Sequence, residues 1–168
     1  MARLFFALWP DAPSAEELGR LASALALRTA GKPVPTAKIH LTLAFLGEVP
    51  AKRVARAASV SIAAHAFTMR LDRAGAFRGA RVAWAGCAEP PAGLMELQSA
   101  LARGLEALDF ALEERAFTPH VTLVRRITAG LPVENIVPVT WQSQEFALMR
   151  SETGTGGYSA LQRWALPG

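Results

Sequence analysis

Short apolar runs alternate along the chain with segments in which leucine recurs at helical spacing. An apolar and aromatic run from Leu4 to Trp9 predicts a buried strand that a Pro-Asp turn ends. A helix is predicted to follow, because Ser14 and Glu17 have the spacing of a capping box. The sequence from Gly31 to Pro33 ends this helix, whose apolar face carries Leu18, Leu21 and Leu25.

The middle of the chain predicts a strand, a helix and a second strand. Strand formers with a polar residue at every second place run from Ile39 to Leu46. A second helix is predicted from Pro50 to Ala64, and a strand from Phe67 to Leu71. The remaining strands are predicted at Arg81–Cys87, His120–Val124, about Gln144–Arg150 and Tyr158–Ala165.

The order strand, leucine-faced helix, His-x-Thr strand occurs twice. The pair His40 and Thr42 recurs as His120 and Thr122 at an offset of 80 residues. At an offset of 76, the leucines of the first helix recur in a later helical face that carries Leu94, Leu97, Leu101, Leu105 and Leu108. We interpret this as a duplication with pseudo-twofold symmetry inside a single domain, residues 1–168, whose related halves span about 1–75 and 76–168.

The composition narrows the class of protein without identifying a partner. With 168 residues, 51% of them hydrophobic, the chain has the size of one globular domain and is not expected to be disordered. One cysteine and three histidines supply a structural metal site poorly, so we expect no metal and no cofactor. No apolar run approaches the roughly 20 residues of a membrane span, so a bacterial cytoplasmic protein is expected. The formal net charge of +4 favours an anionic partner.

The two His-x-Thr pairs are the candidate catalytic residues. Successive side chains of a strand point to opposite faces, so each histidine shares a face with its threonine. With the two related halves facing each other, both pairs would line one cleft. An ordinary imidazole pKa of about 6.5 lets one histidine act as a base while the other, charged, acts as an acid. Threonine hydroxyls donate to anionic oxygens, and the combination fits metal-independent phosphoryl chemistry.

Each of these residues also has an ordinary structural interpretation. A single histidine on a strand is more often a satisfied polar group than a catalyst, but the matched threonine favours function for His40 and His120. His65 has no hydroxyl partner and is interpreted as structural. Phe45 is predicted to face the core, unless a bulge intervenes, rather than to stack on a base. The stretch Gly154–Gly157 is predicted to connect two strands.

The paired motifs resemble those of the two-histidine phosphoesterase superfamily. The opening run Arg3–Leu8, the Thr118-Pro119 lead-in and the closing Tyr158-x-x-Leu161-x-x-Trp164 add to the resemblance. Within the superfamily, the chain is most similar to the bacterial and archaeal RNA 2',3'-cyclic phosphodiesterases, historically called 2'-5' RNA ligases. The segment 151–157 departs from the Pro-rich turn expected before the last strand.

Repeat and resemblance together imply an α+β fold. In it, duplicated strand-helix-strand units form two pseudo-symmetric lobes of antiparallel sheet, with outer helices and an active cleft between the lobes. The resemblance implies that His40 donates the proton to the leaving ribose oxygen and that His120 activates water. Thr42 and Thr122 would hold the phosphate oxygens, and Arg125 would add positive charge.

The implied reaction opens a 2',3'-cyclic phosphate at an RNA end to a 2'-phosphate. Its reverse would join such an end to a 5'-hydroxyl without ATP, and we expect the protein to act as a monomer. Two alternatives remain open: a cyclic phosphodiesterase for a small nucleotide, and a non-catalytic module that binds RNA ends. The intact histidines and threonines argue against the second. Lys38, Arg125 and Arg126 flank the motifs and would either meet an RNA backbone or remain solvated.

Overall fold

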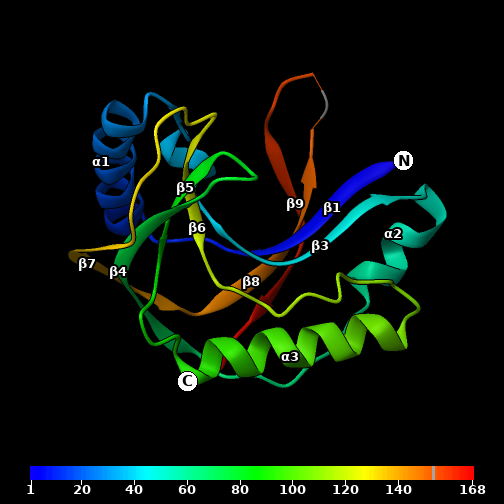
Figure 1. Cartoon of the computed structure of the whole chain (residues 1–168). Helices are drawn as coiled ribbons and strands as arrows, with labels where there is room; N and C mark the ends of the chain where they lie inside the picture. The colour runs from blue at the N-terminus through cyan, green and yellow to red at the C-terminus, as the bar shows by residue number, and fades with distance from the viewer. Residues whose placement is uncertain (153) are drawn as a thin grey trace.

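The chain folds as one antiparallel sheet with helices on its outside (Figure 1). The computed structural model describes residues 1–152 and 154–168. The helices are α1 (Ala12–Thr29), the short 3-10 helix η1 (Thr36–Lys38), α2 (Ala51–Ala58) and α3 (Ala92–Ala107). The strands are β1 (Ala2–Leu8), β2 (Lys32–Pro33), β3 (Leu41–Val49), β4 (Phe67–Phe77), β5 (Val82–Gly86), β6 (Val121–Arg125), β7 (Glu134–Ser143), β8 (Glu145–Ser151) and β9 (Tyr158–Ala165).

The sheet consists of two strand groups joined by a narrow contact. Its order is β7-β4-β5-β6-β3-β1-β8-β9, with β2 paired to β6. The first group, β7-β4-β5-β6, meets the second, β3-β1-β8-β9, through the single residue pair Leu41–Val121. The predicted α+β class, with antiparallel sheet and outer helices, is confirmed. Each group combines strands from early and late parts of the sequence, so the groups do not coincide with the two sequence halves.

The leucine-faced helices lie against strands of opposite groups. α1 packs on β6 and β7, and α3 packs on β3, as Figure 1 shows from the outer positions of the two helices. The predicted apolar faces are confirmed, because Leu18, Leu94, Leu97, Leu101 and Leu105 are fully buried. Each such side chain contributes about 1.5–3 kcal/mol through its burial. The two helices therefore fix the two strands that begin at the histidine motifs.

The cap of the first helix differs from the prediction. Asp11, not Ser14, is the N-cap residue, and its carboxylate accepts the backbone N–H of Ser14 at 2.8 Å. Ser14 is buried inside the first turn, and its hydroxyl donates to the carbonyl of Thr140 at 3.1 Å. The helix begins earlier because Pro13 suits its first turn and aspartate caps as well as serine.

The second helix is shorter than predicted. α2 ends at Ala58, and Ser59 turns its hydroxyl back to the carbonyl of Arg56 at 2.6 Å. Beyond it, Val60 is buried and its carbonyl accepts the indole N–H of Trp164 at 3.0 Å. This tertiary contact fixes the chain beyond α2 outside a helix, in a segment whose β-branched side chains have low helix propensity.

One long strand was not predicted from the sequence. β7 pairs with β4 on one side only and forms an edge of the sheet. Pro138 interrupts its pattern, which argues against a central strand and is tolerated at an edge. No helix in the described part of the chain is long and apolar enough to cross a membrane.

Candidate active site

The narrow contact between the strand groups brings the two motifs together. Each histidine stands immediately before its strand, and Leu41 pairs with Val121 in antiparallel register. Extending that register by one residue places His40 opposite Thr122 and Thr42 opposite His120. Because side chains alternate along a strand, these four residues lie on the face opposite to the two paired, fully buried residues.

Each imidazole is fixed by a backbone carbonyl two residues earlier in the sequence. The Nδ1 of His40 lies 2.7 Å from the carbonyl oxygen of Lys38, and the Nδ1 of His120 lies 2.9 Å from that of Thr118. A carbonyl only accepts, so the proton of each neutral ring is on Nδ1. The Nε2 atom of each ring is therefore left to exchange protons with a substrate.

The ring of His40 is enclosed by aromatic side chains. Its centroid lies 4.8 Å from that of Trp9, 5.1 Å from Phe5 and 5.5 Å from Tyr158. These residues belong to or adjoin a small apolar cluster on the face of β1 and β8 that points away from the main core. Burial lowers the pKa of His40, partly offset by its bond to the Lys38 carbonyl, and the positive charges of Arg125 and His120 lower it further.

His120 has a more open setting. The ring of Phe77 meets it edge to face with centroids 5.0 Å apart, and Phe77 in turn packs on Trp84 at 5.4 Å. Trp84 pairs with Thr122 across β5 and β6, and its ring covers Gly75. A Cβ at Gly75 would lie 2.6 Å from that ring, so glycine is required for this approach.

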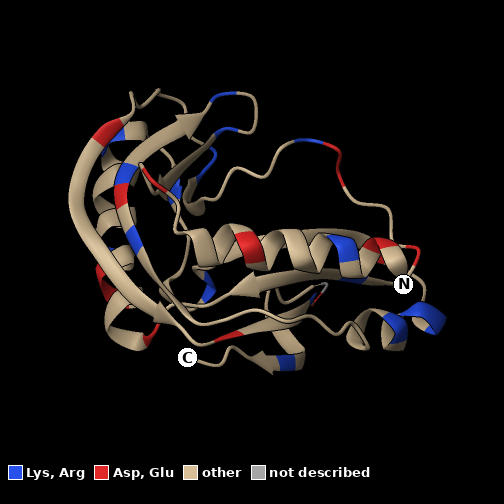
Figure 2. Cartoon of the chain, turned by 90° about the horizontal axis from the view of Figure 1, so that it is seen from below, with Lys and Arg blue, Asp and Glu red and all other residues tan. Residues whose placement is uncertain are grey.

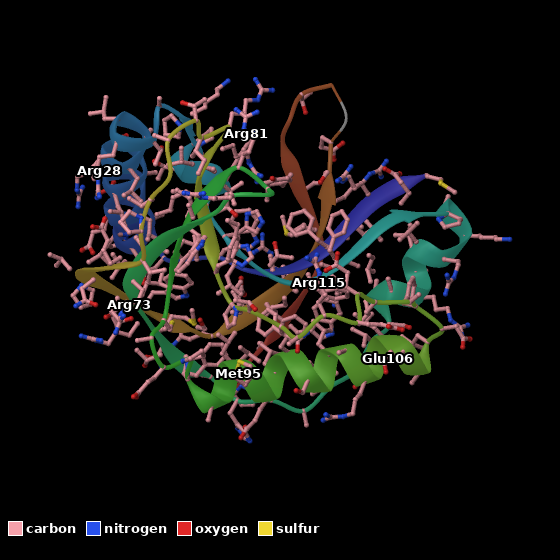
Figure 3. The ribbon with its side chains drawn as sticks, viewed as in Figure 1. Arg28, Arg73, Arg81, Met95, Glu106 and Arg115 are labelled. Atoms are coloured by element: carbon pink, nitrogen blue, oxygen red, sulfur yellow. The ribbon has the colours of Figure 1, made fainter. Side chains whose placement is uncertain are left out.

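A pocket of about 690 Å³ opens beside the motifs. Four of the five predicted site residues line it, namely Thr42, His120, Thr122 and Arg125. His40 does not line it directly, although its pKa responds to the charges of His120 and Arg125. The far wall comes from the segment 112–118, which follows α3 and includes Arg115 (labelled between the strand groups in Figure 3). The structure thus brings four of the predicted residues to one pocket, in which Arg115 is ion-paired with Glu113 and the guanidinium of Arg125 is available to an anion.

The prediction for Phe45 is wrong, because β3 contains a bulge. Ala7 pairs with Thr42, whereas the preceding Phe6 pairs with Ala44, so β3 has one extra residue at this point. The bulge shifts the alternation of side chains and turns Phe45 to the face of Thr42. Phe45 is 45% exposed and lines the pocket.

Sequence reasoning did not assign to the site the aromatic residues that surround the histidines, although it named Tyr158 in the closing motif and Trp9 in the opening run. Trp9, Phe77 and Tyr158 come from three separate strand ends, and the signal available was only their proximity to turns. Lys38 lies with its ammonium 5.8 Å from the ring centre of Tyr158. His65 is exposed and does not line the pocket. Among the described residues, no three His, Cys, Asp or Glu side chains group as metal ligands.

The structure thus places two carbonyl-tethered histidines, two threonines and an arginine close together on one antiparallel sheet. The family model of the 2'-5' RNA ligase superfamily matches residues 9–155 of the chain. The chain therefore belongs to the 2'-5' RNA ligase superfamily, as the paired motifs led us to expect.

Curated relatives and solved structures agree with this membership. The RNA 2',3'-cyclic phosphodiesterase of Escherichia coli (strain K12) is 34% identical, covering 98% of this chain and 96% of that protein. The protein of the same name from Thermus thermophilus is 34% identical over 82% of this chain and 76% of its own length.

Among solved structures, Escherichia coli LigT complexed with 3'-AMP superposes with a TM-score of 0.89 at 33% identity, covering 99% of both chains. LigT complexed with phosphate gives a TM-score of 0.83 at 33% identity, covering 99% of this chain and 98% of that one.

Proposed function

We propose that this chain hydrolyses the terminal 2',3'-cyclic phosphate of an RNA strand to a 2'-phosphate. The observation that supports the proposal is the Leu41–Val121 register, which brings the two His-x-Thr pairs side by side, next to a pocket that His120, Thr42 and Thr122 line. The names of the relatives, RNA 2',3'-cyclic phosphodiesterases, support the choice of substrate.

The two histidines divide the proton transfers between them. The Nε2 of neutral His120, beside the open pocket, takes a proton from water as the water oxygen attacks phosphorus. The bond from phosphorus to the ribose 3'-oxygen breaks, and that oxygen receives the Nε2 proton of charged His40. The protonation states are then reversed, and proton exchange with solvent restores them. The 2'-oxygen keeps the phosphate.

The lowered pKa of His40 fits the acid in this scheme. A desolvated imidazolium gives up its proton more readily than a solvated one. In the free protein, the charges of Arg125 and His120 disfavour that cation. A bound phosphate brings negative charge between these groups, and it thereby favours protonation of His40 when substrate is present.

The remaining pocket residues hold the phosphate and the terminal nucleoside. The hydroxyls of Thr42 and Thr122 and the guanidinium of Arg125 are donors for the nonbridging oxygens, on which charge builds in the transition state. Phe45 presents a ring face for stacking the terminal base, which is worth about 1–3 kcal/mol. The same machinery would run in reverse with a 5'-hydroxyl in place of water, joining two ends without ATP.

A decisive experiment follows the fate of an oligoribonucleotide with a 2',3'-cyclic phosphate in the presence of EDTA. Phosphorus NMR of the product is expected to show a 2'-phosphomonoester. No cleavage under single-turnover conditions would favour the module that only binds RNA ends. Cleavage of mononucleoside cyclic phosphates with higher kcat/KM than any oligonucleotide would favour the small-nucleotide alternative. Activity that EDTA abolishes would contradict the metal-independent mechanism.

A further inference from the structure

A second hollow lies next to the catalytic pocket, behind the turn that joins β4 to β5. Its volume is about 480 Å³, and it is lined by Arg78, Arg81 and the segment 127–130. The two arginines are exposed, and the lining also includes the small residues Ala129 and Gly130. Figure 3 shows Arg81 at the upper end of this strand group, on the opposite side of the molecule from α3 with its labelled Glu106.

The turn separates the hollow from the catalytic pocket. Gly79 and Ala80 line the catalytic pocket, while their neighbours Arg78 and Arg81 line the hollow. On the other strand, Arg125 lines the catalytic pocket and Ile127 lines the hollow. The hollow and the catalytic pocket are therefore adjacent, on either side of the turn.

The backbone holds the hollow in shape and leaves its guanidinium groups available. The Nε of Arg81 donates to the carbonyl of Ile127 at 3.2 Å, and the N–H of Ile127 donates to the carbonyl of Arg81 at 3.1 Å. Arginine has five N–H donors, so the outer nitrogens of Arg81 can still bind a ligand. Arg78 lies beside Gly130, where a Cβ would stand 3.6 Å from its Nη2.

Basic residues are frequent on the segments that line the hollow and on the strands beside them. Lys32 pairs with Arg125 across β2 and β6, and Arg126 follows at the end of β6 with a left-handed φ of 55°. None of Lys32, Arg78, Arg81, Arg125 and Arg126 forms an ion pair with a carboxylate in the part of the chain that the structure describes. Figure 2 shows several Lys and Arg positions on the loops and strands in the upper left of the view, together with some Asp and Glu positions. Such a surface fits a second anionic group of the substrate, close to the phosphate in the catalytic pocket.

We propose that this hollow is a subsite for an internal phosphate of the RNA strand, 5' to the nucleotide whose cyclic phosphate occupies the catalytic pocket. The proposal rests on the proposed function, because it assumes that the RNA end lies beside His120. A strand that leaves the pocket over Gly79 and Ala80 presents its next phosphates to Arg78 and Arg81. A mononucleotide has no such phosphate, so the subsite acts only on longer substrates.

The test compares a mononucleoside 2',3'-cyclic phosphate with oligonucleotides of increasing length, using the whole protein. For wild type, KM is expected to fall when internal phosphates are added. Arg78→Ala is expected to raise the oligonucleotide KM about fivefold and Arg78→Glu further, as for loss of one exposed phosphate contact. The slope of log KM against log salt should decrease by roughly 0.7 per lost contact. For the mononucleotide, KM should stay within experimental error.

Arg103→Glu supplies the matched control, because Arg103 is an exposed arginine on α3. It should leave every KM and the salt slope unchanged. Arg81→Gln is a second test of the subsite, and circular dichroism checks that losing its bond to Ile127 does not unfold the turn. An oligonucleotide KM unaffected by Arg78→Glu would overturn the proposal, as would an equal change on the mononucleotide.

Failure of the proposed function gives a different result. In that case wild type would cleave neither substrate, and the subsite is then tested by fluorescence anisotropy with an oligonucleotide that ends in a 2'-phosphate. Weaker binding by Arg78→Glu than by Arg103→Glu would support the subsite, and equal binding would overturn it.

Discussion

His40 and His120 are held by the backbone in the same way but lie in different surroundings. Each donates from Nδ1 to the carbonyl two residues earlier, at 2.7 Å and 2.9 Å. Three aromatic rings enclose His40, and one meets His120 at the pocket. A repeated backbone thus supplies two imidazoles in the same tautomer, while the burial of His40 among aromatic side chains lowers its pKa. The comparison gives a physical basis for unequal roles in a pseudo-symmetric site.

Removal of either histidine is expected to have the largest effect. His40→Ala and His120→Ala should each lower kcat on the cyclic-phosphate oligonucleotide by about 10²–10⁴-fold, because each removes one proton transfer. His65→Ala is the matched control, since His65 is exposed and outside the pocket, and should retain full activity. Full activity in either His40→Ala or His120→Ala would show that the two histidines are not a catalytic pair.

Loss of a threonine hydroxyl is expected to be milder. Thr42→Ala and Thr122→Ala should each reduce kcat/KM about tenfold or more, as expected for a hydrogen bond to a charged oxygen of about 1.5–3 kcal/mol. The corresponding serine variants keep the hydroxyl and should recover most of the activity. If alanine and serine variants were equally impaired, packing of the methyl group rather than hydrogen bonding would explain the loss.

The exposed ring of Phe45, on the strand that follows His40, provides a third test of the difference between the two histidine motifs. Phe45→Ala should lower kcat/KM by about fivefold or more, because a stacked base contributes about 1–3 kcal/mol. Phe45→Tyr keeps the ring face and should behave like wild type. A cyclic phosphate on an abasic ribose should be cleaved equally by all three proteins. A defect of Phe45→Ala on that abasic substrate would contradict the stacking role.

The smallest expected effect is on the titration of His40. In the free protein, NMR should give His40 a pKa below the ordinary histidine value, because burial disfavours the charged ring. Trp9→Ala opens the aromatic enclosure and should raise that pKa, and inorganic phosphate should raise it in wild type. A His40 pKa at or above the ordinary value in the ligand-free protein would contradict the account.

The lowered pKa of His40 also makes the free energy of unfolding depend on pH. The folded state binds fewer protons at His40 than the unfolded state does between the lowered and the ordinary pKa. The free energy of unfolding is therefore expected to fall as pH decreases through that interval. In His40→Phe this contribution to the pH dependence should be absent, which urea unfolding at several pH values would measure.

Periodic features of the fold were predictable from the sequence. Leucines that recur at the helical period mark the buried face of a helix. Leu97 and Leu101 are fully buried, as predicted. The strand β9 has the predicted bounds, Tyr158–Ala165. The paired motifs led to the correct family, since a repeated His-x-Thr pattern can be recognised whatever the length of the loops between the two copies.

Features that depend on contacts between distant segments were not predictable. The position of Phe45 depends on a bulge in the pairing of β1 with β3, which alternation within β3 alone does not contain. The enclosure of His40 requires Trp9 and Tyr158 to meet from opposite ends of the chain. The cap at Asp11 preceded the predicted one because two acceptable caps lay within one turn.

The central claim is that His40 gives a proton to the leaving oxygen while His120 takes one from water. It is tested most directly with a nucleoside 2',3'-cyclic phosphorothiolate, in which sulfur replaces the 3'-bridging oxygen, because the 3'-thiolate departs from phosphorus without needing a proton. On this substrate, His40→Ala should regain most of the kcat/KM that it loses on the cyclic phosphate, and His120→Ala should remain inactive. Recovery by His120→Ala instead, or by neither variant, would contradict this division of roles.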